Sequence, residues 1–166
     1  MRRILIMGAL LLGTLTMQAQ SHSDHVGFGA GILYEPAAEA TIFWEHETRY
    51  HNAWEVFAQG YLKYDDKQEK LIDGYKTWGI GMAVKPCVYR ARNRYGSLRF
   101  GASVGSNTHD VLAGIHAGYE HNYALKHGWK VYWQVKVDAM LPRRDDLFRT
   151  SLSIGVKLPS HDRLKR

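Results

Sequence analysis

Apolar and polar side chains alternate along most of this chain, in eight stretches of strand length. The clearest stretch runs from residue 128 to 140, with one parity apolar (Trp129, Val131, Trp133, Val135, Val137, Ala139) and the other largely polar (Lys130, Tyr132, Gln134, Lys136, Asp138). Because side chains of a strand point alternately to opposite faces, this segment has an apolar face and a charged face. Eight such segments at nearly even spacing predict a sheet that closes on itself.

We expect strands over about residues 24–34, 39–47, 53–65, 75–89, 95–105, 111–123, 128–140 and 148–158. Long strands, even in number and joined by short turns, are typical of an up-and-down antiparallel barrel. Pro86 lies near the end of the fourth strand, where a missing backbone donor is tolerated best. An even count places both termini at one end, so residues 35–38, 65–73, 106–110 and 141–147 become the external loops.

The first residues resemble a secretory signal peptide. Arg2 and Arg3 precede an apolar run over residues 4–15, and Ala19 offers a small residue at the cleavage point. The run is short for a membrane-spanning helix. We therefore expect a signal peptide over 1–19, a barrel domain over 20–159 and a basic tail over 160–166, which we interpret as a solvated terminus.

Two kinds of barrel share this pattern. A lipocalin-like secreted barrel turns its apolar face inward around a ligand, whereas a membrane barrel has an apolar outer band, aromatic girdles and a polar lumen. The polar parity here is rich in glycine, which relieves crowding inside a narrow eight-stranded barrel, and it carries charges of both signs that a lumen can pair. These features favour the transmembrane type of all-β, eight-stranded barrel.

The expected sites follow from this orientation. We predict a polar network in the lumen, formed by Glu55, Lys63, Lys85, Arg99, His116, Glu120, Lys136, Asp138, Arg149 and Lys157. Aromatic side chains near strand ends are expected to face lipid as girdles, namely Trp44, Trp54, Trp78, Trp129, Trp133 and Phe148. An interior of this width should be filled by its own side chains, so we expect no conduction of solutes.

Candidate chemistry is sparse. Nine histidines are scattered without the spacing of a zinc site, so we expect no metal and no cofactor. His116 and Glu120 share the lumen parity, and Ser103 or Ser153 could complete a serine–histidine–acid set. A lipid-modifying enzyme, however, must present its nucleophile outward. We therefore interpret these residues as part of the lumen network and expect no enzymatic activity.

Charge and cysteine content narrow the partners. The formal net charge of +6 is spread along the chain and forms no basic stripe of the kind that binds nucleic acid. A single cysteine, Cys87, excludes an intrachain disulfide framework. The expected partners are outer-membrane lipid and proteins of the envelope.

Four stretches of the chain resemble TraO proteins of Bacteroidetes conjugative transposons. They read YHNAWEVFAQGYLKY (50–64), VKPCVYRARNRYGSLRFGASVG (84–105), AGYEHNYALKHGWKVYWQVKVD (117–138) and DLFRTSLSIGVKLP (146–159). The resemblance implies an outer-membrane barrel encoded with genes of a mating apparatus, and it supplies no catalytic or ligand residues.

We therefore expect a non-enzymatic outer-membrane component of a conjugative transfer apparatus, with a structural or assembly role and with mating-apparatus proteins as partners. A stand-alone small barrel for envelope integrity or adhesion is the first alternative. A secreted lipocalin-like ligand-binding barrel is the second.

Overall fold

The computed structural model describes residues 23–34, 37–63, 76–106, 110–141 and 148–160, apart from the side chains of Lys63 and Lys76. The expected signal peptide and residues 161–166 of the basic tail lie outside this part of the chain. So do most residues of the four expected external loops.

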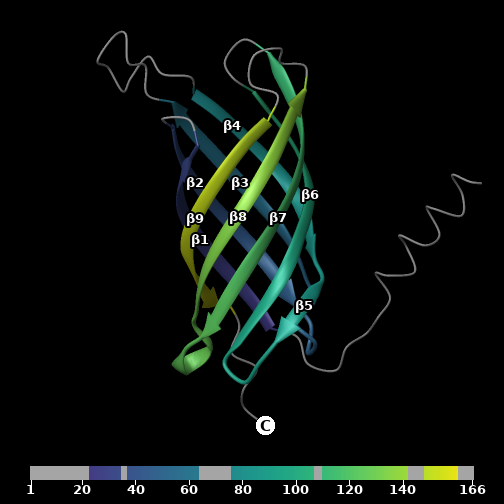
Figure 1. Cartoon of the computed structure of the whole chain (residues 1–166), viewed down its shortest axis with the longest axis vertical. Helices are drawn as coiled ribbons and strands as arrows, with labels where there is room; N and C mark the ends of the chain where they lie inside the picture. Colours follow the sequence, from purple (N-terminus) through teal and green to yellow (C-terminus); the bar gives the residue numbers. More distant parts are fainter. Residues whose placement is uncertain (1–22, 35–36, 64–75, 107–109, 142–147, 161–166) are drawn as a thin grey trace, which may run out of the picture.

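The described residues form an all-β, eight-stranded antiparallel barrel (Figure 1). Its elements are β1 (Ser23–Leu33), β2 (Ala37–Glu47), β3 (Ala53–Lys63), β4 (Lys76–Lys85), β5 (Cys87–Arg90), β6 (Arg94–Ser106), β7 (Val111–Ala124), a 3-10 helix (Lys126–Gly128), β8 (Lys130–Leu141) and β9 (Phe148–Pro159). Apart from β4 and β5, which both pair with β6, each strand pairs with its sequence neighbours, and the β1–β9 and β4–β6 pairings complete the ring. The expected fold class is confirmed.

β4 and β5 pair with successive parts of β6 and so occupy one strand position of the barrel wall, which we call a stave. The nine labelled strands therefore give eight staves. The prediction of one continuous strand over 75–89 was wrong at Pro86, which separates the two elements. Proline has no N–H to donate to a ladder, although its carbonyl still accepts a hydrogen bond from the Leu98 N–H at 3.0 Å. Beyond it the register with β6 shifts between Cys87 and Tyr89, as in a β-bulge.

The strands are strongly staggered around the ring. The stagger can be measured by starting at Asp24 and stepping from each residue to its pairing partner on the next strand around the ring. This path does not return to Asp24 but to Tyr34, which directly follows β1 and lies ten residues further along the chain. The path is Asp24, His46, Trp54, Val84, Phe100, Ala117, Val137, Thr150 and Tyr34. A stagger of this kind requires tilted strands, as Figure 1 shows.

We call the end of the barrel that carries Ser23 and Ser160 the terminal end, and the opposite end the loop end. At the terminal end the Ser160 N–H donates to the Asp24 carbonyl at 2.7 Å. The β7–β8 connection there contains the 3-10 helix, so β8 begins at Lys130 and not at 128 as expected. His127 and Gly128 turn the chain with positive φ angles of 62° and 78°, a conformation that glycine adopts at little cost.

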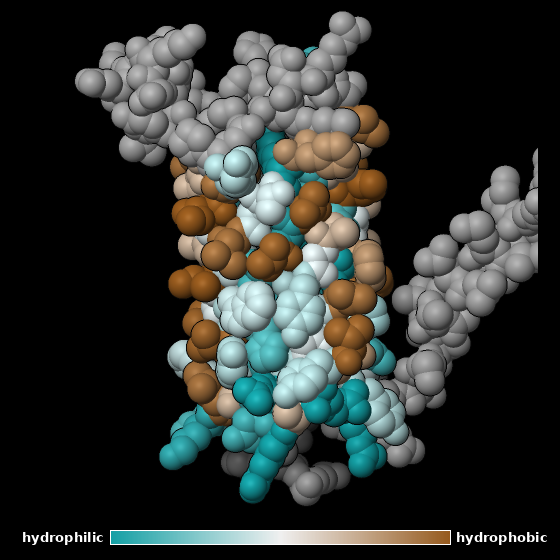
Figure 2. Space-filling view, viewed as in Figure 1, coloured by the Kyte–Doolittle hydropathy of each residue, from teal (hydrophilic) through white to brown (hydrophobic). Residues whose placement is uncertain are grey.

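The apolar parity of the strands faces outward. Exposed large apolar residues occur on every stave, for example Ile42, Ile80, Ile115 and Ile154. Figure 2 shows hydrophobic side chains over the wall of the barrel, with hydrophilic side chains gathered at the terminal end. Across the described segments, no helix has the length and hydrophobicity that a membrane span requires.

Candidate functional site

The interior of the barrel holds a network of buried charges centred on Lys85. Its ammonium group lies 2.7 Å from a carboxylate oxygen of Glu45, 2.5 Å from Glu55 and 2.7 Å from Glu120. Lys157 contacts Glu45 and Glu120 at 2.8 and 2.6 Å, and Arg99 donates to Glu55 at 2.7 Å. Three cations thus face three carboxylates in one continuous cluster, which compensates the cost of burying each charge.

A second group of polar side chains closes the terminal end of the lumen. The Glu47 carboxylate accepts hydrogen bonds from Lys130 and from the Tyr95 hydroxyl, both at 2.6 Å. His51 contacts the other oxygen of Glu47 at 2.6 Å and stacks on the Tyr95 ring with centroids 4.2 Å apart. The β2–β3 turn, which carries His51, is thereby fixed to the interior of the barrel.

A third group occupies the loop-end half of the lumen. Lys136 donates to Glu39 at 2.7 Å, and Asp138 accepts a hydrogen bond from the Tyr61 hydroxyl. Asp138 also lies 2.5 Å from Nδ1 of His116, whose Nε2 is 2.7 Å from the Ser103 hydroxyl. Side chains from β2, β3, β6, β7 and β8 therefore meet at this level.

Aromatic rings pack among these charged groups. Phe43, Phe57, Ala83 and Tyr132 form an apolar cluster of buried residues. The Lys85 ammonium lies 4.9 Å from the Phe43 ring centroid, and the Arg99 guanidinium lies 4.5 Å from that of Phe57. Such cation–π contacts are stronger where water is excluded, so the rings both fill the lumen and stabilise its cations.

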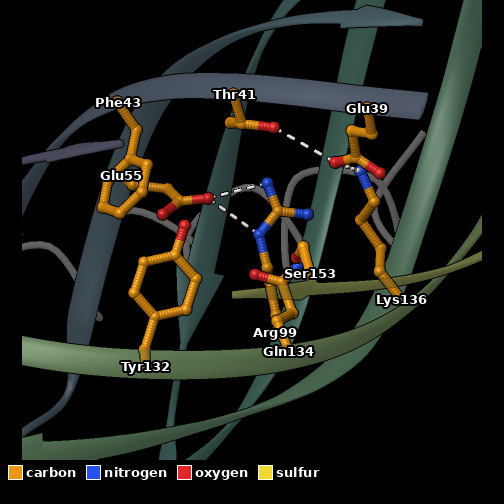
Figure 3. A pocket seen from close by; sticks show the side chains of 9 residues that line it. All are labelled: Glu39, Thr41, Phe43, Glu55, Arg99, Tyr132, Gln134, Lys136 and Ser153. Atoms are coloured by element: carbon orange, nitrogen blue, oxygen red, sulfur yellow. Dashed lines mark hydrogen bonds and ion pairs between the residues drawn. The ribbon is translucent and has the colours of Figure 1, made fainter. Parts of the chain in front are cut away.

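Almost no free space remains between these side chains. The cavity in Figure 3 lies among Glu39, Thr41, Phe43, Glu55, Arg99, Tyr132, Gln134, Lys136 and Ser153. Its free volume of about 10 Å³ has room for about one water molecule. This part of the lumen is therefore filled largely by its own side chains.

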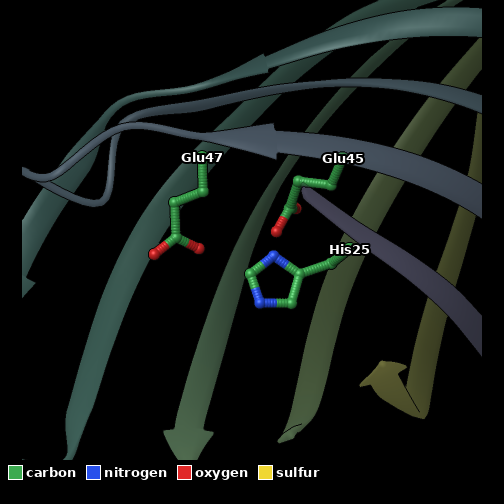
Figure 4. Close-up of side chains that lie close together, drawn as sticks. All are labelled: His25, Glu45 and Glu47. Carbon is green, nitrogen blue, oxygen red and sulfur yellow. The ribbon is translucent and has the colours of Figure 1, made fainter. Parts of the chain in front are cut away.

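Two groups of side chains have donor atoms close enough to hold a metal ion. One is His25, Glu45 and Glu47 (Figure 4), where Nδ1 of His25 has no hydrogen-bond partner. The other is Glu45, Glu55 and Glu120. In both groups lysine ammonium groups already bind the carboxylates, and a divalent cation would have to displace them. The arrangement therefore gives no support for a metal centre.

The structure places eight of the ten predicted network residues together in the interior, namely Glu55, Lys85, Arg99, His116, Glu120, Lys136, Asp138 and Lys157. Arg149 is half-buried over the Tyr61 ring at 5.1 Å, and its Nη1 has no hydrogen-bond partner. Lys63 ends β3, and its side chain lies outside the described part of the structure.

Sequence reasoning missed several members of the network. The omitted residues are His25, Glu39, Glu45, Glu47, Tyr61, Tyr95 and Lys130. The signal was present, because Glu39, Glu45 and Glu47 alternate with the apolar residues of β2 just as the predicted charges do elsewhere. Tyr61 and Tyr95 also lie on the polar parity of β3 and β6, but they did not stand out because a tyrosine ring suits either face.

The predicted girdle residues all lie on the outer face. Trp44 and Trp54 pack edge to face with centroids 4.9 Å apart, and Trp133 stacks on His121 at 5.7 Å. These residues and Trp129 lie toward the terminal end, whereas Trp78 and Phe148 lie toward the loop end. Exposed fractions of 49% for Trp129 and 68% for Phe148 show how far such rings project from the wall.

Compared with known proteins, the chain matches no family model, no curated protein and no solved structure. We therefore interpret the site from its own geometry.

Proposed function

We propose that this chain is an outer-membrane β-barrel that serves a conjugative transfer apparatus in a structural or assembly role. The proposed membrane location rests on the orientation of the apolar and polar faces of the sheet. Exposed apolar side chains surround the wall, while paired charges fill the interior. An exposed apolar surface of this extent is costly in water and suits the hydrocarbon of a bilayer.

Closure of the sheet supports the same location. The β4–β6 and β1–β9 pairings close the ring, and among the described strands only the four-residue β5 has an edge without a strand partner. In lipid every backbone N–H and C=O must find a partner within the protein, and a closed barrel meets this requirement.

The interior argues against the lipocalin-like alternative. A ligand-binding barrel of that kind needs an apolar cavity of hundreds of cubic ångströms. The described interior holds buried lysine, arginine and glutamate side chains, and the cavity among them in Figure 3 has a free volume of only about 10 Å³. A lumen filled in this way does not favour a channel, so we propose functional contacts at the ends and on the outer wall.

The link to conjugation rests on the resemblance to TraO proteins. It makes other proteins of the mating apparatus the expected partners, beside outer-membrane lipid. The proposed role requires no enzymatic chemistry, no cofactor and no direct contact with nucleic acid.

Deletion of the gene from its host tests the proposal. We expect the frequency of mating to fall and to recover when the wild-type chain is supplied from another locus, with the protein sedimenting with outer-membrane fractions. Normal mating with altered envelope permeability or surface attachment would instead favour a stand-alone barrel. Recovery of the wild-type chain as a soluble periplasmic protein would contradict the membrane location.

A further inference from the structure

Within the loop-end group of the lumen, three side chains on neighbouring strands form a hydrogen-bonded chain. Ser103 lies on β6, His116 on β7 and Asp138 on β8. Nε2 of His116 is 2.7 Å from Oγ of Ser103, and Nδ1 is 2.5 Å from Oδ1 of Asp138. From this geometry we propose that Ser103 is a nucleophile activated by His116 and oriented through Asp138, with reactivity toward small unbranched acyl esters.

The chemistry of the three groups fixes the direction of the hydrogen bonds. A carboxylate can only accept, so neutral His116 carries its proton on Nδ1 and donates it to Asp138. Nε2 then accepts the proton of the Ser103 hydroxyl. A serine, a base and an orienting acid in this order are the parts by which a nucleophilic triad is recognised, whatever the fold.

The surroundings hold His116 and Asp138 rigidly. The exposed fractions of the two side chains are 0% and 1%. Tyr61 donates to the second oxygen of Asp138, and the Lys136 ammonium lies 3.3 Å from the same atom. The Phe57 ring packs edge-on against the imidazole at 5.5 Å. Removal of water and fixed orientation favour proton transfer from serine to histidine.

The wall of the lumen beside Ser103 consists of small residues, which is why we propose a small, unbranched acyl group. Gly79 and Gly105 pair with each other one step closer to the loop end, so this strip of β4 and β6 presents no side chains to the lumen. The three atoms nearest to a methyl group added at Gly79 would be backbone atoms at 3.4–3.8 Å, whereas a methyl group added at Gly105 would collide with the Trp78 carbonyl. Met140 lies against Gly114 on the other side of Ser103, and its unbranched side chain can rotate aside.

The reaction consumes only the ester and water. Oγ of Ser103 attacks the ester carbonyl carbon while its proton passes to Nε2 of His116. The ester C–O bond then breaks, and the alcohol leaves with that proton. Water hydrolyses the acyl-serine by the same route, with His116 as the base, and yields the carboxylic acid.

The test uses an alkyl fluorophosphonate on the full mature chain folded in detergent micelles. We expect the intact mass to rise by one phosphonyl group, with loss of fluoride, and peptide mapping to place the adduct on Ser103. Ser153 is the matched control, because it is buried to 6% against 5% for Ser103 and has no histidine among its described hydrogen-bond partners. Ser153→Ala should keep the adduct, whereas Ser103→Ala should lose it.

His116→Gln should slow labelling about a hundredfold or more, because a general base contributes at least that factor. A gel that separates folded from heat-unfolded barrel verifies that each variant is folded. If the folded wild-type chain carries no adduct while a serine esterase in the same micelles is labelled, the proposal is overturned. Equal labelling of Ser153 overturns it too. Neither result bears on the membrane location or on mating, which this experiment does not use.

Discussion

Lys85 illustrates how a single residue organises the interior. Its ammonium group contacts three carboxylates from three strands, and its side chain is 2% exposed. Glu45 and Glu120 are also bound by Lys157, whereas Glu55 is bound by Arg99. Loss of Lys85 would leave three buried carboxylates with two cations. An intact buried ion pair contributes little to stability, whereas removal of one partner leaves an uncompensated buried charge that is strongly destabilising.

We therefore predict that Lys85→Met lowers the free energy of unfolding by about 3–5 kcal/mol, the usual cost of breaking a buried ion pair from one side. The urea concentration at half-unfolding of the barrel in micelles measures it. Arg49→Met, on the exposed β2–β3 turn, is the control and should change stability by less than about 0.5 kcal/mol. Equal stability of the two variants would contradict the role of the central cluster.

At the scale of the strands, glycines make room for the rings inside. Gly27 on β1 lies against the end of the Phe43 ring of β2, which the register places directly opposite. Phe43 in turn packs edge to face with Tyr132 at 5.7 Å. A methyl group at Gly27 would occupy the space of the Phe43 ring and force the aromatic cluster to move.

Gly27→Ala should accordingly destabilise the barrel by about 1–3 kcal/mol, the range for overpacking a filled interior. Gly60→Ala on β3 is a matched control, because an added methyl group there meets no heavy atom within 4 Å. That variant should be neutral or slightly more stable. Thermal unfolding of both variants, followed by gel mobility, distinguishes them. A neutral Gly27→Ala would show that the interior is looser than the structure indicates.

The period of two along each strand was enough to predict the barrel and the face on which each charge lies. It could not predict which charges meet, because this depends on the register between strands. His116 and Glu120 share a face, yet four residues of strand separate them by about 13 Å. The β7–β8 register instead places Asp138 directly opposite His116. Glu120 binds Lys85 and Lys157 in the central cluster.

The interruption at Pro86 had a signal in the sequence, whereas the exact start of β8 did not. Proline removes a ladder donor wherever it lies, so a break in that strand was foreseeable. Trp129 continues the alternation of β8 and could equally have belonged to it. The 3-10 helix before it depends on positive φ angles at His127 and Gly128, and such angles are uncommon outside glycine, although histidine adopts them more often than most residues.

At the scale of the whole molecule, the outer surface changes along the barrel axis from basic at the terminal end to apolar on the wall. The exposed turns and strand ends of the terminal end carry Arg49, Arg90, Arg92, Arg94 and Lys126, whereas the wall between the two ends of the barrel carries apolar side chains. Leu125 lies among the basic turns and Val135 on the wall, and both are exposed, at 53% and 39%. The two positions thus differ in their proposed surroundings, which are water and headgroups for Leu125 and hydrocarbon for Val135.

The proposed membrane location predicts opposite outcomes for the same substitution at these positions. Val135→Arg places a charge on the outer wall between Tyr119 and Leu152, the neighbours in the register, and should lower the stability of the barrel in vesicles by about 2–4 kcal/mol. Leu125→Arg should cost about 0–1 kcal/mol, because arginine near the interface reaches water. Urea titration of both variants refolded into phospholipid vesicles measures the difference. If Val135→Arg were as stable as Leu125→Arg in vesicles, hydrocarbon would not surround this part of the wall, and the proposal of an outer-membrane barrel would fail.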